Sequence, residues 1–234
     1  MKKLLAYHGK QSIKDDLIVQ LEAHYEADEI ISGIYWANGK GCAVGCTVHS
    51  GNHADYEPMY GIPQILAHLE DAIFESLPKI RQKKWPLKFA KAINVGADLS
   101  LVWPKFAVFL LTDKIHGIIQ YAKTEDQRKA IQKVSDLYSS NGFITLDQWI
   151  QERNTIYSHA PPADAPHIAP SYGAHIARAD AAHVARADAA HIAPSYAADA
   201  ANAAAHYIAL HGDIRQKYRI VQSEKLLQLL SECR

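Results

Sequence analysis

The sequence predicts an all-α protein, in which a helical core domain is followed by an alanine-rich helical arm and a C-terminal amphipathic helix. Three observations predict this fold class. Apolar residues recur at helical spacing in several segments, two segments carry helix-start signatures, and runs with strand periodicity are few and short. A chain of 234 residues is long enough to bury a sizeable core.

The first helix is predicted from Ser12, a capping residue, to about Ser32, with apolar residues at helical spacing between them. The apolar segment 30–36 either extends this helix or forms a short strand. Residues 38–41, Asn-Gly-Lys-Gly, are typical of a turn. The segment 42–49 that follows is predicted to be a short helix or a buried stretch.

Later helix boundaries are marked by proline and threonine. Pro63 opens a helix that Pro78 stops, and the Trp-Pro pairs at 85–86 and 103–104 each indicate a helix entry. Thr124 and Thr145 each begin a Thr-x-x-Gln capping box, in which side chains satisfy backbone donors at the helix start.

The composition changes abruptly at residue 159, where alanine begins to dominate and an eight-residue period appears. We therefore predict a core domain over 1–158, an Ala/His-rich octad-repeat helical region over 159–211, and an amphipathic helix over 212–234. An octad advances about 80° around a helix, so His175, His183 and His191 spiral instead of forming a metal-binding stripe.

Charge and cysteine content exclude several classes of protein. Lys+Arg and Asp+Glu both total 25, so the net charge is zero, and no basic stripe of the kind that binds nucleic acid is present. No segment contains the roughly 20 apolar residues that cross a bilayer. Three cysteines make no disulfide framework, which favours a reducing, cytoplasmic location. We expect no nucleic-acid or membrane partner.

The segment 39–53 has the most unusual residue choice, and a metal site is the first hypothesis for it. Cys42, Cys46 and His49 are zinc-ligand types spaced four and three residues apart, with His53 beyond. On one helix Cys42 and Cys46 lie about 6 Å apart, but the axial rise from Cys42 to His49 is about 10.5 Å, too far for one tetrahedral centre. The segment then supplies half a site, and the other ligands come from His8, His24 or Asp28.

A nucleophilic cysteine is the second hypothesis. Cys42 follows a glycine-rich turn, and a thiol at a helix N-terminus has a lowered pKa. Catalysis requires a base, for which His49 is the candidate, with His24 and His8 as alternatives. A third hypothesis is a phosphate cradle at residues 39–41, although the Walker spacing is missing.

Close packing is the competing interpretation of the same segment. Residues 42–46 are all small, as required where one element crosses another, and free cysteine behaves as a small hydrophobe. Two further polar clusters are present. His24 and Asp28 are spaced to pair on a helix, whereas Glu70 and Asp71 are adjacent and diverge, which disfavours a di-carboxylate site.

Several motifs together resemble a known family. They are Gly-Lys-Gly-Cys-Ala-Val-Gly-Cys-Thr at 39–47, Gly-Ile-Pro at 61–63 with His-Leu-Glu-Asp at 68–71, Gly-Ala-Asp-Leu-Ser at 96–100, and Trp-Pro at 103–104. With the alanine-rich tail, these are similar to an uncharacterised bacterial family whose members also occur on phages and other mobile elements. The resemblance covers most of residues 1–140. It implies a bacterial or mobile-element context and no catalytic residues, because the family has no established activity.

Two functions remain open at this stage. The first is a non-enzymatic helical protein that associates with a protein partner or with itself, favoured by balanced charge and by an alanine-rich arm suited to close packing. The alternative is a small enzyme or metal-binding protein centred on Cys42, Cys46 and a nearby histidine. The sequence names no cofactor.

Overall fold

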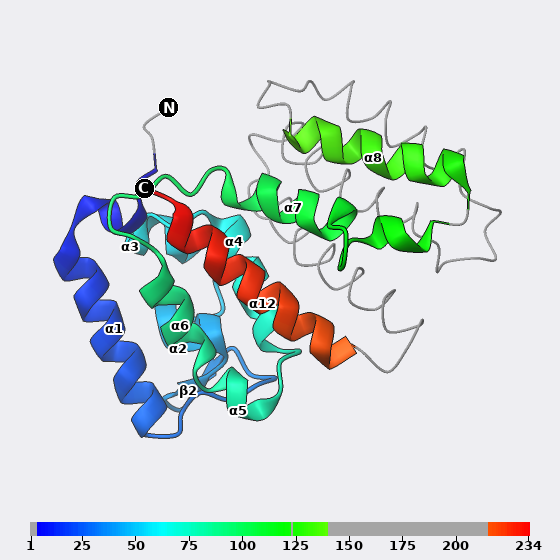
Figure 1. Ribbon diagram of the computed structural model, residues 1–234. Helices are drawn as coiled ribbons and strands as arrows, with labels where there is room; N and C mark the ends of the chain where they lie inside the picture. The colour runs from blue at the N-terminus through cyan, green and yellow to red at the C-terminus, as the bar shows by residue number, and fades with distance from the viewer. Residues whose placement is uncertain (1–3, 123, 140–214) are drawn as a thin grey trace. The chain divides into compact units, whose positions relative to one another are not determined.

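The computed structural model describes residues 4–122, 124–139 and 215–234 (Figure 1). Helices dominate these residues and the sheet in them has two short strands, which confirms the predicted all-α class. The α-helices are α1 Gln11–Glu26, α2 Ala43–Val48, α3 Tyr56–Tyr60, α4 Gln64–Phe74, α5 Lys79–Gln82, α6 Trp85–Ala92, α7 Val102–Thr112, α8 Glu125–Ser139 and α12 Arg215–Glu232. The short 3-10 helices are η1 Ala6–Gly9, η2 His53–Asp55 and η3 Ile118–Tyr121.

The chain divides into two compact units, residues 1–102 with 219–234 and residues 103–218. The predicted domain boundaries at 158 and 211, the octad repeats and the capping box at Thr145 lie outside the described residues, so they stay predictions. None of the helices in the described ranges combines the length and apolar character needed to span a bilayer.

Helix α1 differs from its prediction at both ends. It starts at Gln11 after Lys10, with no side-chain cap, so Ser12 lies inside the first turn. It ends at Glu26, because Asp28 takes a left-handed conformation with φ of 55° that a helix cannot continue. The predicted pair of His24 with Asp28 is therefore wrong: without helical spacing, Asp28 pairs with Lys83 instead.

A hairpin follows α1, which confirms the strand alternative for the end of segment 30–36. Strand β1, Trp36–Ala37, pairs antiparallel with β2, Lys40–Gly41. The two residues between them, Asn38 and Gly39, both have positive φ, 52° and 78°, as a type I′ hairpin requires. The turn predicted at 38–41 is thereby confirmed.

Helix α2 lies at the centre of the first unit, in contact with α1, α4 and α6. All six of its residues are buried. Gly45 explains how this is achieved, because a Cβ at that position would overlap the backbone carbonyl of Tyr35. The predicted close crossing at residues 42–46 is confirmed, and it fixes the position of Cys42 relative to the segment 33–35.

The predicted helix starts agree with the structure where it describes them, but α4 ends at Phe74, before Pro78, which instead precedes α5. The Trp-Pro pairs begin α6 and the first turn of α7, and Pro63 precedes α4. The backbone N–H of Gln127 donates to Thr124 Oγ1 (3.2 Å), which confirms the Thr124 half of the capping box. Within the first unit the end of α12 is anchored by the Asn94 amide, which donates to the carbonyls of Ser231 and Cys233.

Candidate functional site

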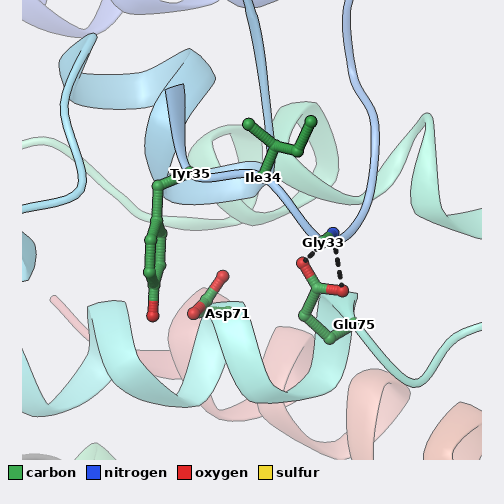
Figure 2. A pocket seen from close by; sticks show the side chains of 5 residues that line it. All are labelled: Gly33, Ile34, Tyr35, Asp71 and Glu75. Carbon is green, nitrogen blue, oxygen red and sulfur yellow. Dashed lines mark hydrogen bonds between the residues drawn. The ribbon is translucent and has the colours of Figure 1, made fainter. Parts of the chain in front are cut away.

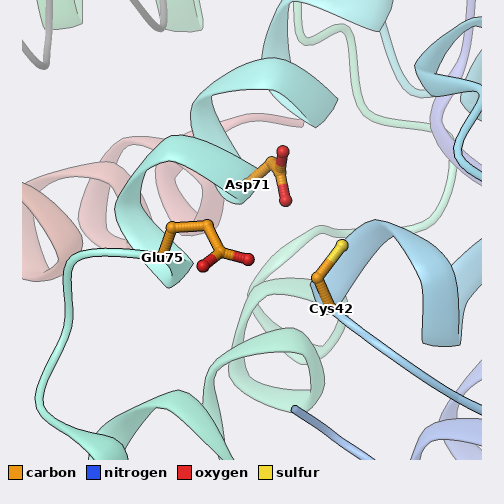
Figure 3. Close-up of side chains that lie close together, drawn as sticks. All are labelled: Cys42, Asp71 and Glu75. Carbon is orange, nitrogen blue, oxygen red and sulfur yellow. The ribbon is translucent and has the colours of Figure 1, made fainter. Parts of the chain in front are cut away.

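The site is formed where the start of α2 faces the end of α4. Cys42 precedes the first residue of α2, while Asp71 lies in the last turn of α4 and Glu75 follows that helix. Figure 3 shows the three side chains pointing toward one another, and one ligand atom from each lies within 4.8 Å of the others. Asp71 and Glu75 share a face because they are four residues apart on a helical path.

A cavity of about 200 Å³ opens beside this cluster, lined by Gly33, Ile34, Tyr35, Asp71 and Glu75. Figure 2 shows the segment 33–35 on one side and α4 on the other. The two sides are joined by the backbone N–H of Gly33, which donates to both carboxylate oxygens of Glu75 at 3.1 Å. The cavity therefore exposes two acids and a phenol to one small volume.

The titratable groups of the cluster lie close to negatively charged neighbours. Burial, followed by the charge of Asp71, raises the pKa of the Cys42 thiol, whose residue is 1% exposed. Burial is also the main cause that raises the pKa of Glu75. The hydrogen bond from the Gly33 N–H lowers this pKa, and the negative charge of Asp71 raises it further. The pKa of Tyr35 is raised by burial and then by Asp71, Cys42 and Glu75. Each side-chain charge acting on these three groups is thus negative.

Asp71 carries an unused acceptor. Its Oδ2 accepts a hydrogen bond from His53 Nε2 (3.3 Å), whereas its Oδ1 is fully buried without a well-formed hydrogen bond among the described residues; the Cys42 thiol is the donor that also acts on this carboxylate. An unpaired buried carboxylate oxygen costs free energy, so it indicates a missing positive or donating partner. The ring of His53 stacks on the ring of His68, with the ring centroids 3.9 Å apart and the ring planes at 4° to each other. Burial, with His53 second, lowers the pKa of His68 to about 4, so this second ring is neutral.

The other predicted ligands lie elsewhere. The Cys46 thiol donates to the carbonyl of Gly41 (3.4 Å), and burial raises its pKa to about 12. His49 is at the C-terminal end of α2, where its Nε2 faces Nε2 of His24 (2.9 Å). In the described part of the chain, the structure groups Cys42 with Asp71 and Glu75 and does not bring Cys46 or His49 to it.

This placement bears on the nucleophile and phosphate hypotheses. A nucleophilic cysteine must be a thiolate, and the raised pKa of Cys42 keeps the thiol protonated at neutral pH. His49, the predicted base, is engaged with His24. Within the predicted phosphate cradle at 39–41, the N–H of Gly41 is already used internally, because it donates to Glu29 O. Neither chemistry is favoured by these contacts.

Sequence reasoning missed Asp71, Glu75 and Tyr35 as companions of Cys42. Glu70 and Asp71 do diverge as expected, since Glu70 points into the core and accepts a hydrogen bond from Tyr56 (2.7 Å). The pair at i and i+4, Asp71 with Glu75, was the available signal for two carboxylates on one face. The approach of Tyr35 depends on tertiary packing and has no such signal.

Glu70 provides a prediction on stability. Burial raises the pKa of this carboxyl to about 8, so the folded protein retains a proton that the unfolded chain loses near pH 4.5. The unfolded state binds fewer protons between these values, and stability consequently falls as pH rises. We expect the free energy of unfolding of Glu70→Gln, relative to the native protein, to rise by about 3.5 kcal/mol from pH 5 to pH 8. Urea unfolding across this range measures it.

Glu26→Gln is the matched control, since Glu26 is exposed and the same change there leaves the pH dependence as in the native protein. Parallel stability curves for Glu70→Gln and the native protein would contradict a protonated Glu70.

Comparisons of the chain with family models, curated proteins and solved structures return no match.

Proposed function

We propose that this chain is a metal-binding helical protein that holds a zinc-type divalent ion between Cys42, Asp71 and Glu75. The convergence of these three donors from two helical elements, to within 4.8 Å, is the observation that carries the proposal. Donors around one tetrahedral zinc lie about 3.3–3.8 Å apart, so small side-chain movements complete the site.

The donor set selects the class of ion. Thiolate is a soft ligand that favours zinc and related transition metals, whereas magnesium and calcium take oxygen ligands alone. A dication also supplies the charge that the cluster lacks. It offsets two of the three negative charges of the thiolate and the two carboxylates, and it provides a partner for the buried Oδ1 of Asp71.

The surroundings of the three donors are those of a metal site that a small molecule can reach. Three protein ligands leave a tetrahedral ion one open position, which is the arrangement of catalytic rather than structural zinc sites. The adjacent cavity gives that position room for water or a small molecule. His53 donates to Asp71 and would orient it, as groups outside the ligand sphere do in metalloproteins.

Calorimetric titration with Zn²⁺ tests the proposal. We expect a binding event at this site that Asp71→Asn weakens by more than the roughly 10- to 100-fold typical of outer-sphere substitutions. Binding must displace the proton of Cys42, so we expect proton release and an affinity that rises with pH. Titration in buffers of different ionisation enthalpy measures that release.

Asp16→Asn, the same change at an exposed position of α1, is the matched control and keeps native affinity. Equal zinc binding by both variants would contradict the proposed site.

The association role expected from the alanine-rich arm stays a prediction, since residues 159–211 lie outside the described ranges. It is compatible with a metal site in the first unit. A cytoplasmic location and the absence of a nucleic-acid partner likewise stay predictions.

A further inference from the structure

A second group of metal-ligating side chains lies apart from the Cys42 cluster. His24 in the last turn of α1 and His49 at the end of α2 direct their Nε2 atoms at each other, 2.9 Å apart. The ring of Trp36 stacks on His49, with centroids 4.5 Å apart and planes at 22°, and meets His24 edge-on at 5.4 Å. Three elements thus hold two imidazoles in a fixed arrangement.

Glu29 fixes the tautomer of His24. Its Oε2 lies 2.6 Å from His24 Nδ1 and accepts a hydrogen bond from it, so Nδ1 is the donor nitrogen of this ring. Nε2 is the nitrogen left for a metal ion, and it faces His49. A histidine that ligates a metal almost always donates its other N–H to a carboxylate or carbonyl, and His24 already has this partner.

The spacing of the two rings is close to that of a chelate. Two nitrogens bound at about 2.05 Å to one tetrahedral ion lie about 3.3 Å apart, so the rings need to separate by about 0.4 Å. His49 changes tautomer in the process, which releases the hydrogen bond between the rings. Burial is the main cause that lowers the pKa of His49, and the neighbouring His24 ring lowers it further. The lowered pKa favours the neutral form of His49, which is the form that binds metal.

We propose that His24 and His49 form a second metal site, selective for ions that prefer imidazole, namely Ni²⁺, Cu²⁺ and Zn²⁺. Glu29 orients His24, and solvent completes the coordination because His49 is exposed. This site shares no residue with the proposed Cys42 site and does not depend on it.

Quenching of tryptophan fluorescence by Ni²⁺ tests this proposal, because Trp36 touches both rings and a paramagnetic ion there quenches it. We expect saturable quenching in the native chain that His24→Ala and His49→Asn abolish. Asparagine is chosen at position 49 because the backbone φ of 53° is left-handed, which asparagine tolerates. Glu29→Gln is expected to weaken the binding about 10- to 100-fold.

Three further variants make the outcome decisive. His8→Asn, the same change at an exposed histidine of the same unit whose φ of 51° is also left-handed, retains the quenching. Trp36→Phe removes the signal while calorimetry still detects the ion. Cys42→Ser also retains the quenching, so failure of this site is distinguishable from failure of the Cys42 site. Saturable quenching that survives in both His24→Ala and His49→Asn would overturn the proposal.

Discussion

Replacing Cys42 by serine is expected to abolish tight zinc binding at the α2–α4 site. The hydroxyl does not ionise near neutral pH, so the ion loses its one thiolate and only two carboxylate ligands remain. The loss of affinity should exceed the roughly 10- to 100-fold cost of removing an outer-sphere partner. Calorimetric titration of the two proteins under the same conditions gives the ratio.

Cys46→Ser is the matched control for this experiment. It makes the same change four residues away, where the thiol donates to the carbonyl of Gly41 and a hydroxyl can do the same. We expect it to bind zinc as the native protein does. Loss of binding in Cys46→Ser with retention in Cys42→Ser would contradict the assignment of ligands made here.

The second large effect is expected at Gly45. In an ordinary helix, alanine is favoured over glycine by about 1 kcal/mol, so Gly45→Ala would stabilise α2 if there were space. The added Cβ instead overlaps the carbonyl of Tyr35, which belongs to the backbone and can move only with its segment. We expect a loss of about 3 kcal/mol in the free energy of unfolding, as overpacked cores show. Urea unfolding measures it.

Gly9→Ala separates steric overlap from backbone conformation. Gly9 has φ of 71° with open space around its Cα. Alanine there is disfavoured by the backbone conformation and not by steric overlap, so we expect a loss of about 1 kcal/mol in the free energy of unfolding. Native or higher stability in Gly45→Ala would show that α2 and the segment 33–35 do not approach as closely as described.

Local signals account for the parts of the fold that were predicted. Helix starts at the Trp-Pro pairs and at Thr124 depend on neighbouring residues, and the turn at Asn38-Gly39 depends on two residues that tolerate positive φ. The end of α1 was missed because apolar residues continue beyond Glu26. Those apolar residues instead pack beside the hairpin, where the Ile31 N–H donates to Gly41 O. Hydrophobic periodicity alone does not distinguish a longer helix from such a segment.

The candidate site was predicted only in part, because local signals identify Cys42 but not the residues that packing brings to it. Cys42 could be chosen from its position after a glycine turn, but its companions are 29 and 33 residues further on, in α4 and just after it. Residue type pointed to Cys46 and His49 as co-ligands and linear spacing allowed Cys46 alone beside Cys42, yet α2 is too buried to present both thiols to one ion. Which face of α4 meets α2 is decided by packing, and a single sequence does not report it.

Cobalt(II) spectroscopy tests the central claim most directly, because a thiolate bound to Co²⁺ produces a near-ultraviolet charge-transfer band that carboxylates and imidazoles do not. We predict this band in the native protein and in Cys46→Ser, its absence in Cys42→Ser, and its displacement by Zn²⁺. A native protein without the band, or a band that persists when Cys42 is replaced, would contradict a metal centre at Cys42, Asp71 and Glu75.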